Sequence, residues 1–156
     1  MDITKFLADG LLIIILMISV IAGLRGLAWR RWQGIIPYAI MAGLSSLLVG
    51  KLLSLVYQPT ILRPFLERGV QPGAAYIDNP GFPSDHMLLA GVVVLAIYYL
   101  TPYRQLSYIL GLMALVMGIA RVVALVHTPL DIIGGAVAAC SGIVWYRHMT
   151  KAQASH

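Results

Sequence analysis

The sequence is poor in charged residues. Asp, Glu, Lys and Arg together make up 11% of its 156 residues, whereas soluble domains carry about 25%. Hydrophobic residues make up 60%. This balance excludes an ordinary soluble domain and is typical of a protein embedded in a membrane.

Cysteine is almost absent as well. Cys140 is the only one and lies in an apolar run, so neither a disulfide framework nor a cysteine metal site can form. The chain has 11 Lys and Arg against 6 Asp and Glu, but the basic residues are scattered among apolar segments. This scatter argues against a nucleic-acid partner and favours a membrane protein that meets anionic substrates.

Five apolar stretches of about 15–23 residues are present, and a helix of about 20 residues crosses the hydrocarbon core. They are roughly Phe6–Leu24, Ile35–Tyr57, His86–Leu100, Leu106–Val126 and Pro129–Tyr146. Backbone polar groups must be paired inside lipid, so each stretch is expected to be a helix. We predict an all-α, integral-membrane bundle of about five transmembrane helices. It forms a single domain, 1–156, with its functional motifs between about 51 and 146.

The distribution of basic residues predicts the orientation of this bundle. With five spans, the segments 25–34, 101–105 and 147–156 lie on one side. They contain Arg25, Arg30, Arg31, Arg104, Arg147 and Lys151. The positive-inside rule places this side in the cytoplasm. The N-terminus and the loop 58–85 should then lie outside a plasma or inner membrane.

The connection Gln58–Ser84 is the one long loop and holds five of the 8 prolines. Long loops of this kind are usually functional or disordered. The apolar residues Ile61, Leu62, Phe65 and Tyr76 argue against disorder. We expect the loop to lie at the membrane surface.

The last expected helix carries a stripe of small residues along one side, Gly134, Ala138 and Gly142. Small residues at this spacing let helices approach closely. We interpret the stripe as packing within the bundle. Packing between the subunits of a homo-oligomer is the alternative.

Three polar clusters should meet at the outer ends of the helices. They are Arg63-Pro64 with Lys51 upstream, the segment Phe82–His86, and the group Arg121, His127 and Asp131. Ionisable residues at membrane depth are costly and usually serve a function. The topology brings the clusters to one side although they lie far apart in sequence.

The residue types in these clusters suit the binding of a phosphoryl group. Arg63 and Arg121 carry planar guanidinium groups that can hold phosphate oxygens in bidentate fashion. Ser84 is a typical N-cap residue, and the amides that follow it attract anions. Two arginines and a helix N-terminus therefore indicate an anion site.

Two histidines and a carboxylate add reactive groups to this site. His127 could act as a nucleophile or base, and Asp131 could fix its tautomer. His86 is free to act as an acid. Together with the arginines, these groups indicate phosphoryl transfer.

Each residue also has a structural interpretation. Thr128-Pro129 is an ordinary helix start, where Asp131 would complement the helix dipole. Arg63 could be a surface anchor, and Lys51 could simply reach the interface. The joint pattern favours the functional interpretation.

The motifs resemble those of the type-2 phosphatidic acid phosphatase superfamily, whose usual signature is K-x6-RP, PSGH and SR-x5-H-x3-D. Here they read Arg63-Pro64, "PSDH" and Arg121-x5-His127-x3-Asp131. The phrases "FPSDH", "LVYQPTILRPF" and "VHTPLDIIGG" resemble the bacterial undecaprenyl-diphosphate phosphatase branch. The resemblance extends from about Lys51 to Trp145.

This resemblance implies a phosphatase that needs no metal ion or other cofactor and forms a phosphohistidine. His127 would attack phosphorus, Asp131 would orient it, and His86 would protonate the leaving oxygen. The residues implied to bind the substrate phosphate are Arg63, Arg121, Ser84, Lys51 and, within "PSDH", Asp85.

The sequence departs from the family pattern at three positions. Lys51 stands twelve positions before Arg63 instead of seven, and Val56 occupies the usual place. Ala120 replaces the serine before the arginine of the third motif. Asp85 replaces glycine and brings a negative charge close to the anion site. Family members commonly have six spans, so this chain is expected to lack the first.

The resemblance favours a lipid phosphatase that hydrolyses undecaprenyl diphosphate to undecaprenyl phosphate and phosphate. The alternative substrates are phosphatidic acid, phosphatidylglycerol phosphate and lipid A. A lipid or ion transporter that uses the same charges for binding is the non-enzymatic alternative. The expected partner is thus a lipid phosphate or diphosphate in the bilayer.

Overall fold

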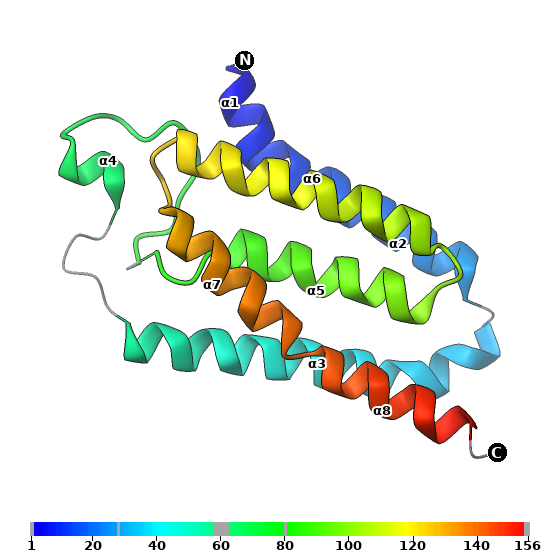
Figure 1. The fold of residues 1–156 in the computed structure, drawn as a ribbon. Helices are drawn as coiled ribbons and strands as arrows, with labels where there is room; N and C mark the ends of the chain where they lie inside the picture. The colour runs from blue at the N-terminus through cyan, green and yellow to red at the C-terminus, as the bar shows by residue number, and fades with distance from the viewer. Residues whose placement is uncertain (1, 28, 58–62, 80, 155–156) are drawn as a thin grey trace.

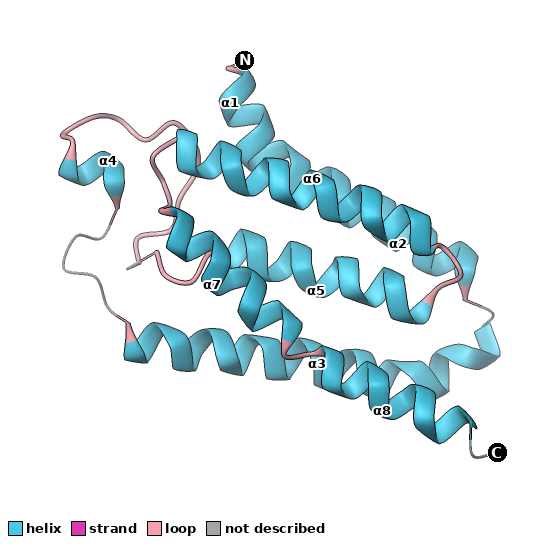
Figure 2. Cartoon of the chain, in the orientation of Figure 1, coloured by secondary structure: helices cyan, strands magenta, loops and turns pink. Residues whose placement is uncertain are grey.

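The structure is a computed structural model that describes residues 2–27, 29–57, 63–79 and 81–154 (Figure 1). The regular secondary structure of these residues consists of helices joined by loops, and no strand is present in them (Figure 2). The predicted all-α membrane bundle is therefore confirmed.

The helices coincide with the five apolar stretches, although the helix of the second stretch begins at Trp29, before the predicted Ile35, and the helix that ends the last stretch continues to Ala154, beyond the predicted Tyr146. The first stretch comprises α1 (Ile3–Lys5), the π-helical turn η1 (Phe6–Gly10) and α2 (Leu11–Gly26). It is followed by α3 (Trp29–Val56), the short α4 (Pro64–Glu67), α5 (Asp85–Leu100), α6 (Arg104–Val123), α7 (Pro129–Cys140) and α8 (Ile143–Ala154).

Within the described residues, four helical stretches are long and apolar enough to cross a membrane. They are Ile3–Gly26, Trp32–Val56, Arg104–Val123 and Pro129–Met149, and α5 is a shorter apolar helix. The α7 and α8 helices together form the last stretch, with a turn at 141–142 between them. A bundle of about five membrane helices results.

The α5 helix lies in the middle of the bundle and packs against α6 and α7 (Figure 1). The main apolar core is shared by α2, α5 and α6. Its buried members are Leu11, Ile15, Ala22, Ala90, Ile97, Leu110, Ala114 and Met117. The α3 helix packs on the other side, against α7 and α8.

The small-residue stripe packs inside the bundle, as interpreted from the sequence. A Cβ atom on Gly134 would lie 2.6 Å from the Phe82 ring, and one on Gly142 would lie 3.0 Å from the carbonyl oxygen of Ala42. Ala138 between them is completely buried. The stripe is therefore occupied by contacts within the chain.

The connections separate into two ends, as the topology predicted. The N-terminus, the loop with α4 and the junction between α6 and α7 lie at one end, which we call the site end (Figure 1). The α2–α3 and α5–α6 connections and the C-terminus lie at the other, the opposite end.

The long loop folds onto the site end. Phe65 of α4 is buried in a second apolar cluster with Ala8 and Val126, and its ring centroid lies 4.9 Å from that of Tyr76. Ile61 and Leu62 lie outside the described residues. The apolar side chains of the described part thus contribute to an ordered structure.

Candidate active site

The junction between α6 and α7 forms the base of the site. Leu125 has a φ of 59°, and this turn directs carbonyl groups toward the long loop. The Ala124 and Leu125 carbonyls accept hydrogen bonds from Gly73 N and Phe65 N, each at 3.0 Å. The loop is thereby fixed to the junction through its backbone.

His127 and Asp131 form a buried pair directly after this turn. Nδ1 of His127 lies 3.3 Å from Oδ2 of Asp131, and the side chains are 4% and 8% exposed. The same carboxylate oxygen accepts a hydrogen bond of 2.7 Å from the Thr128 backbone N–H. The Thr128 hydroxyl accepts one of 3.2 Å from the Asp131 N–H. This capping box starts α7, so Asp131 caps the helix and contacts the histidine at once.

The hydrogen bonds assign the protonation of His127. An ionised carboxylate only accepts hydrogen bonds, so this contact favours the tautomer in which Nδ1 carries the proton and donates a hydrogen bond to Asp131. Nε2 is then an unprotonated nitrogen with an available lone pair. Burial lowers the pKa of His127 below 6.5, and the hydrogen bond to Asp131 partly opposes this. Burial therefore favours the neutral imidazole.

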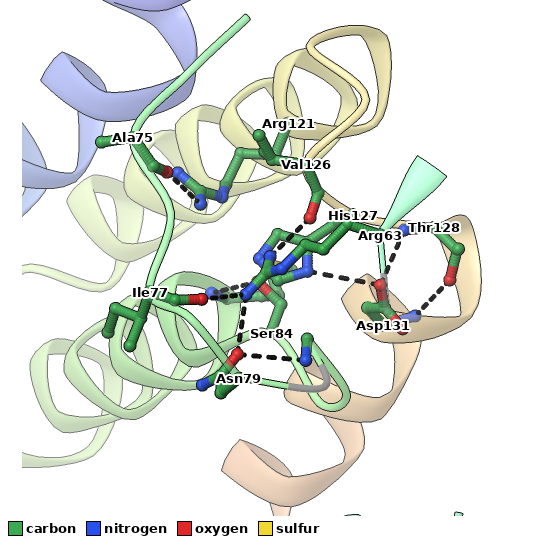
Figure 3. Close-up of polar contacts among 12 residues, drawn as sticks. Arg63, Ala75, Ile77, Asn79, Ser84, Arg121, Val126, His127, Thr128 and Asp131 are labelled. Atoms are coloured by element: carbon green, nitrogen blue, oxygen red, sulfur yellow. Dashed lines mark hydrogen bonds and ion pairs between the residues drawn. The ribbon is translucent and has the colours of Figure 1, made fainter. Parts of the chain in front are cut away.

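Arg63 is buried beside this histidine (Figure 3). Its Nη1 donates to the Val126 carbonyl. Its Nη2 donates to the carbonyl of Ile77 at 2.9 Å and to Oδ1 of Asn79 at 2.7 Å. The guanidinium is thus fixed by the α6–α7 junction on one side and by the loop on the other.

Arg121 is held in a similar way from the last turn of α6. Its Nη1 donates to the Ala8 carbonyl at 3.3 Å and to Oδ1 of Asp9 at 2.9 Å. Its Nη2 donates to the Ala75 carbonyl at 2.9 Å. The side chain is 1% exposed, so its charge is neutralised inside the protein by Asp9.

Both guanidinium groups retain unused donors. Each carries five N–H groups and makes three hydrogen bonds to the protein. Among the described residues, the buried side-chain polar atoms without a partner are Ser19 Oγ and the Nε atoms of Arg63 and Arg121. Leaving a buried charged donor unpaired is costly. The two Nε–H groups are therefore donors that remain available to a bound anion.

Ser84 lies at the start of α5 and contacts α7. Its side chain is completely buried, its N–H donates to the Asp131 carbonyl at 2.9 Å, and its Oγ accepts from Met87 N at 3.4 Å. The predicted N-cap is confirmed. A Cβ on Gly135 would lie 2.6 Å from the Ser84 carbonyl oxygen, so glycine here permits the contact.

The remaining predicted residues lie around this centre. His86 is half-buried in the first turn of α5, within electrostatic range of Arg121 and His127. Asp85 is exposed and lines, with Lys51, an adjacent cleft of about 140 Å³ between α3 and the start of α5. Lys51 is exposed and forms no ion pair among the described residues. Because Asn79 lines the same cleft and bonds to Arg63, Lys51 lies beside the arginine centre.

The sequence analysis missed Asp9, Asn79 and the backbone carbonyls that hold the arginines. Asp9 carried a signal, because an acidic residue within an apolar span usually has a partner. Asn79 and the carbonyls carried none. Within the described part of the chain, no three His, Cys, Asp or Glu side chains are grouped as metal ligands.

The fold and site define a multi-pass membrane protein with two buried arginines and a His127–Asp131 pair at one end of its bundle. Residues 34–154 match the family model of the PAP2 superfamily. The chain belongs to this superfamily, as its motifs predicted.

A curated relative extends the comparison. The chain is 30% identical over 112 residues to "Undecaprenyl-diphosphatase BcrC" of Bacillus subtilis (strain 168), which covers 70% of this chain and 55% of the relative. The chain therefore spans about half the length of that protein. No solved structure matches the chain.

Proposed function

We propose that this protein is a membrane lipid phosphatase that hydrolyses undecaprenyl diphosphate to undecaprenyl phosphate and phosphate. The observation that carries the proposal is the buried His127 held by Asp131, beside two buried arginines whose Nε groups have no protein partner. The name of the Bacillus relative supports the lipid class.

In the first step, Nε2 of His127 attacks the terminal phosphorus of the substrate. A P–N bond forms as the bond between phosphorus and the bridging oxygen breaks, and the electron pair leaves with that oxygen. His86 donates a proton to the leaving oxygen. Arg63 and Arg121 stabilise the charge on the phosphoryl oxygens, as fixed donors do most strongly in a site that excludes water.

In the second step, water attacks the phosphohistidine. His86, now neutral, accepts a proton from the water, the P–N bond breaks, and its electron pair returns to Nε2. Phosphate leaves and His127 is regenerated. Throughout both steps, the Asp131 carboxylate keeps the proton on Nδ1 and stabilises the cationic ring of the intermediate.

The site is proposed to face the outside of a plasma or inner membrane, with the C-terminus in the cytoplasm. The basic segments of the opposite end support this orientation. A lipid in the outer leaflet could then present its headgroup to the site while its tail stays in the bilayer.

Phosphate release from a panel of lipids tests this function. Purified protein in detergent micelles with EDTA should release phosphate fastest from undecaprenyl diphosphate. Phosphatidic acid, phosphatidylglycerol phosphate and lipid A serve as the comparison substrates. Faster release from one of them would reassign the substrate. No release from any lipid, or strict dependence on added magnesium, would overturn the proposed mechanism and favour a binding or transport role.

Lys51 is proposed to supply a cation at the edge of this site. It lines the same cleft as Asp85 and Asn79, and Asn79 bonds to Arg63. Lys51→Met should lower turnover by roughly tenfold to a thousandfold through lost electrostatic stabilisation. The double variant Val56→Lys, Lys51→Met, which has the family spacing, should recover part of that loss. Normal turnover in Lys51→Met would reduce Lys51 to an interfacial anchor.

A further inference from the structure

The first membrane helix begins with a distorted turn that directs an acid inward. Residues Phe6–Gly10 form a π-helical turn between α1 and α2, and such turns occur frequently at functional sites. Ala8 of this turn is completely buried. The adjacent Asp9 side chain is 24% exposed. An apolar membrane helix thus places a carboxylate against the arginine centre.

Asp9 closes a ring of hydrogen bonds with two other segments. Its Oδ1 accepts from Nη1 of Arg121 at 2.9 Å, and its Oδ2 accepts from the Ala75 N–H at 2.9 Å. The Ala75 carbonyl in turn accepts from Nη2 of Arg121 at 2.9 Å. Arg121 lies 112 positions from Asp9 in the sequence, and Ala75 lies 66 positions from it. The ring therefore joins three segments that are distant in the chain.

This ring extends to the second arginine through a short segment of the loop. We call residues 75–79 the strap. The strap bonds Arg121 through the Ala75 carbonyl and Arg63 through the Ile77 carbonyl and the Asn79 side chain (Figure 3). Because Asp9 holds the N–H at the start of the strap, it influences the position of both guanidinium groups.

Two physical effects make a carboxylate at this position valuable. A buried guanidinium without a counter-ion is strongly destabilising, and Asp9 supplies the one acidic partner recorded for Arg121 in the described residues. A charged donor also stabilises a transition state best when its orientation is set in advance. Asp9 meets both needs while leaving Nε of Arg121 unpaired.

We infer that Asp9 is a positioning residue for phosphoryl transfer: it fixes the orientation of the Arg121 guanidinium and of the strap without touching the phosphoryl group. The inference rests on the proposed function, because it assigns Arg121 to the phosphoryl oxygens. It adds the N-terminal helix, which lies outside the matched family region of residues 34–154, to the machinery of the site.

The first test replaces the carboxylate by an amide of the same size. Asp9→Asn removes the charge and replaces one carboxylate oxygen by an NH₂ group, which cannot accept the hydrogen bond from Arg121 or from Ala75 that the oxygen accepted. We expect kcat to fall about tenfold to a hundredfold, as small misplacements of catalytic groups do, with a smaller change in KM. Asp2→Asn removes the same charge from the same helix away from Arg121, and it should retain wild-type kinetics.

A double-mutant cycle separates positioning from general stability. In an Arg121→Lys background, the guanidinium fork that Asp9 orients is gone, and only its effect on Arg63 through the strap remains, so adding Asp9→Asn should lower kcat by a smaller factor than it does in the wild-type background. Independent, multiplicative losses from the two substitutions would overturn the inference, since residues acting through one another are not additive. Wild-type kcat in Asp9→Asn would overturn it as well.

Two controls keep the outcomes distinct. If Asp9→Asn fails to fold, Asp9→Glu keeps the charge but shifts it by one methylene. A lowered kcat in that variant supports positioning, and a wild-type kcat contradicts it. If the wild-type protein itself releases no phosphate from undecaprenyl diphosphate or the other lipids, the proposed function fails. If the wild type is active and both Asp9 variants match it, only the present inference fails.

Discussion

The site end and the opposite end of the bundle use arginine in different ways. At the site end, Arg63 and Arg121 are 4% and 1% exposed and are bonded by carbonyl groups from distant segments. At the opposite end, Arg25 and Arg104 are exposed. The guanidinium of Arg104 lies 5.5 Å from the centroid of the Tyr98 ring.

Aromatic and apolar contacts replace the polar network at the opposite end. The Tyr99 and Tyr146 rings stack with centroids 5.2 Å apart. An apolar cleft of about 310 Å³, lined by residues such as Val20, Trp32 and Ile97, separates parts of α2, α3 and α5. Packing of this kind stabilises a bundle without fixing any charge. The buried, oriented charges at the site end therefore point to chemistry, because stability alone does not require them.

Replacing one histidine at each end by alanine should give the largest difference in turnover between the two ends. His127→Ala should abolish turnover, because it removes the atom that forms the P–N bond. His148, which is exposed at the opposite end, is the matched control, and His148→Ala should retain full activity. Phosphate release from undecaprenyl diphosphate measures both. Substantial turnover by His127→Ala would exclude the phosphohistidine mechanism.

Replacing an arginine by lysine should sharpen the same contrast. Arg121→Lys should lower kcat about a hundredfold to a thousandfold, the range found when one fixed donor to a developing charge is lost. Lysine keeps the charge but cannot reproduce the planar fork. Arg104→Lys changes an exposed arginine in the same helix and should leave kcat unaltered. Equal rates for both variants would remove the distinction between buried and exposed arginines.

A methyl group added beside Ser84 should test how tightly the site end is packed. In Gly135→Ala, the new Cβ would lie 2.6 Å from the Ser84 carbonyl oxygen. Overpacking of this kind typically destabilises by about 1–3 kcal/mol, so the apparent Tm in detergent and kcat should both fall. Gly43 has open space around its Cβ position, and Gly43→Ala should keep Tm or raise it. A Gly135→Ala variant as stable as wild type would show that the segment can shift without loss.

The pH dependence should show the smallest effect. Neutral His127 is the nucleophile and burial lowers its pKa below 6.5, so the acidic limb of kcat/KM should lie below that pH. Asp131 raises the pKa through its hydrogen bond, so Asp131→Asn should shift the limb to still lower pH while reducing the rate. Comparing both proteins on one substrate cancels the ionisation of the substrate. A shift to higher pH would contradict the assigned pairing.

The sequence predicted the parts of this structure that depend on local pattern. Hydropathy located the five helical stretches, and the N-cap preferences of Ser84 and Thr128 located the starts of α5 and α7. Asp131 had two interpretations from the sequence, as a complement to the helix dipole or as the partner of His127, and in the structure its carboxylate contacts both the Thr128 N–H and His127. Each of these signals is carried by residues close together in the chain.

The contacts that hold the arginines could not be predicted in the same way. Every residue has a carbonyl, so Ala75 and Ile77 carry no mark of their role. Asp9 bonds to Arg121 from a π-helical turn, 112 positions away in the sequence. The placement of Lys51 was left open by its spacing, and the structure puts it on the adjacent cleft.

The short central helix has a consequence for the surrounding lipid. With 16 residues, α5 is about 24 Å long at a rise of about 1.5 Å per residue. The hydrocarbon core is about 30 Å thick. If the C-terminal end of α5 is level with one interface, Ser84 and His86 at its other end lie about 6 Å beneath the opposite one. The reaction would then take place in a recess below the headgroup plane, to which water and a lipid phosphate must both descend. Membrane thickness would therefore set how far the substrate has to sink, and thinner bilayers should favour turnover.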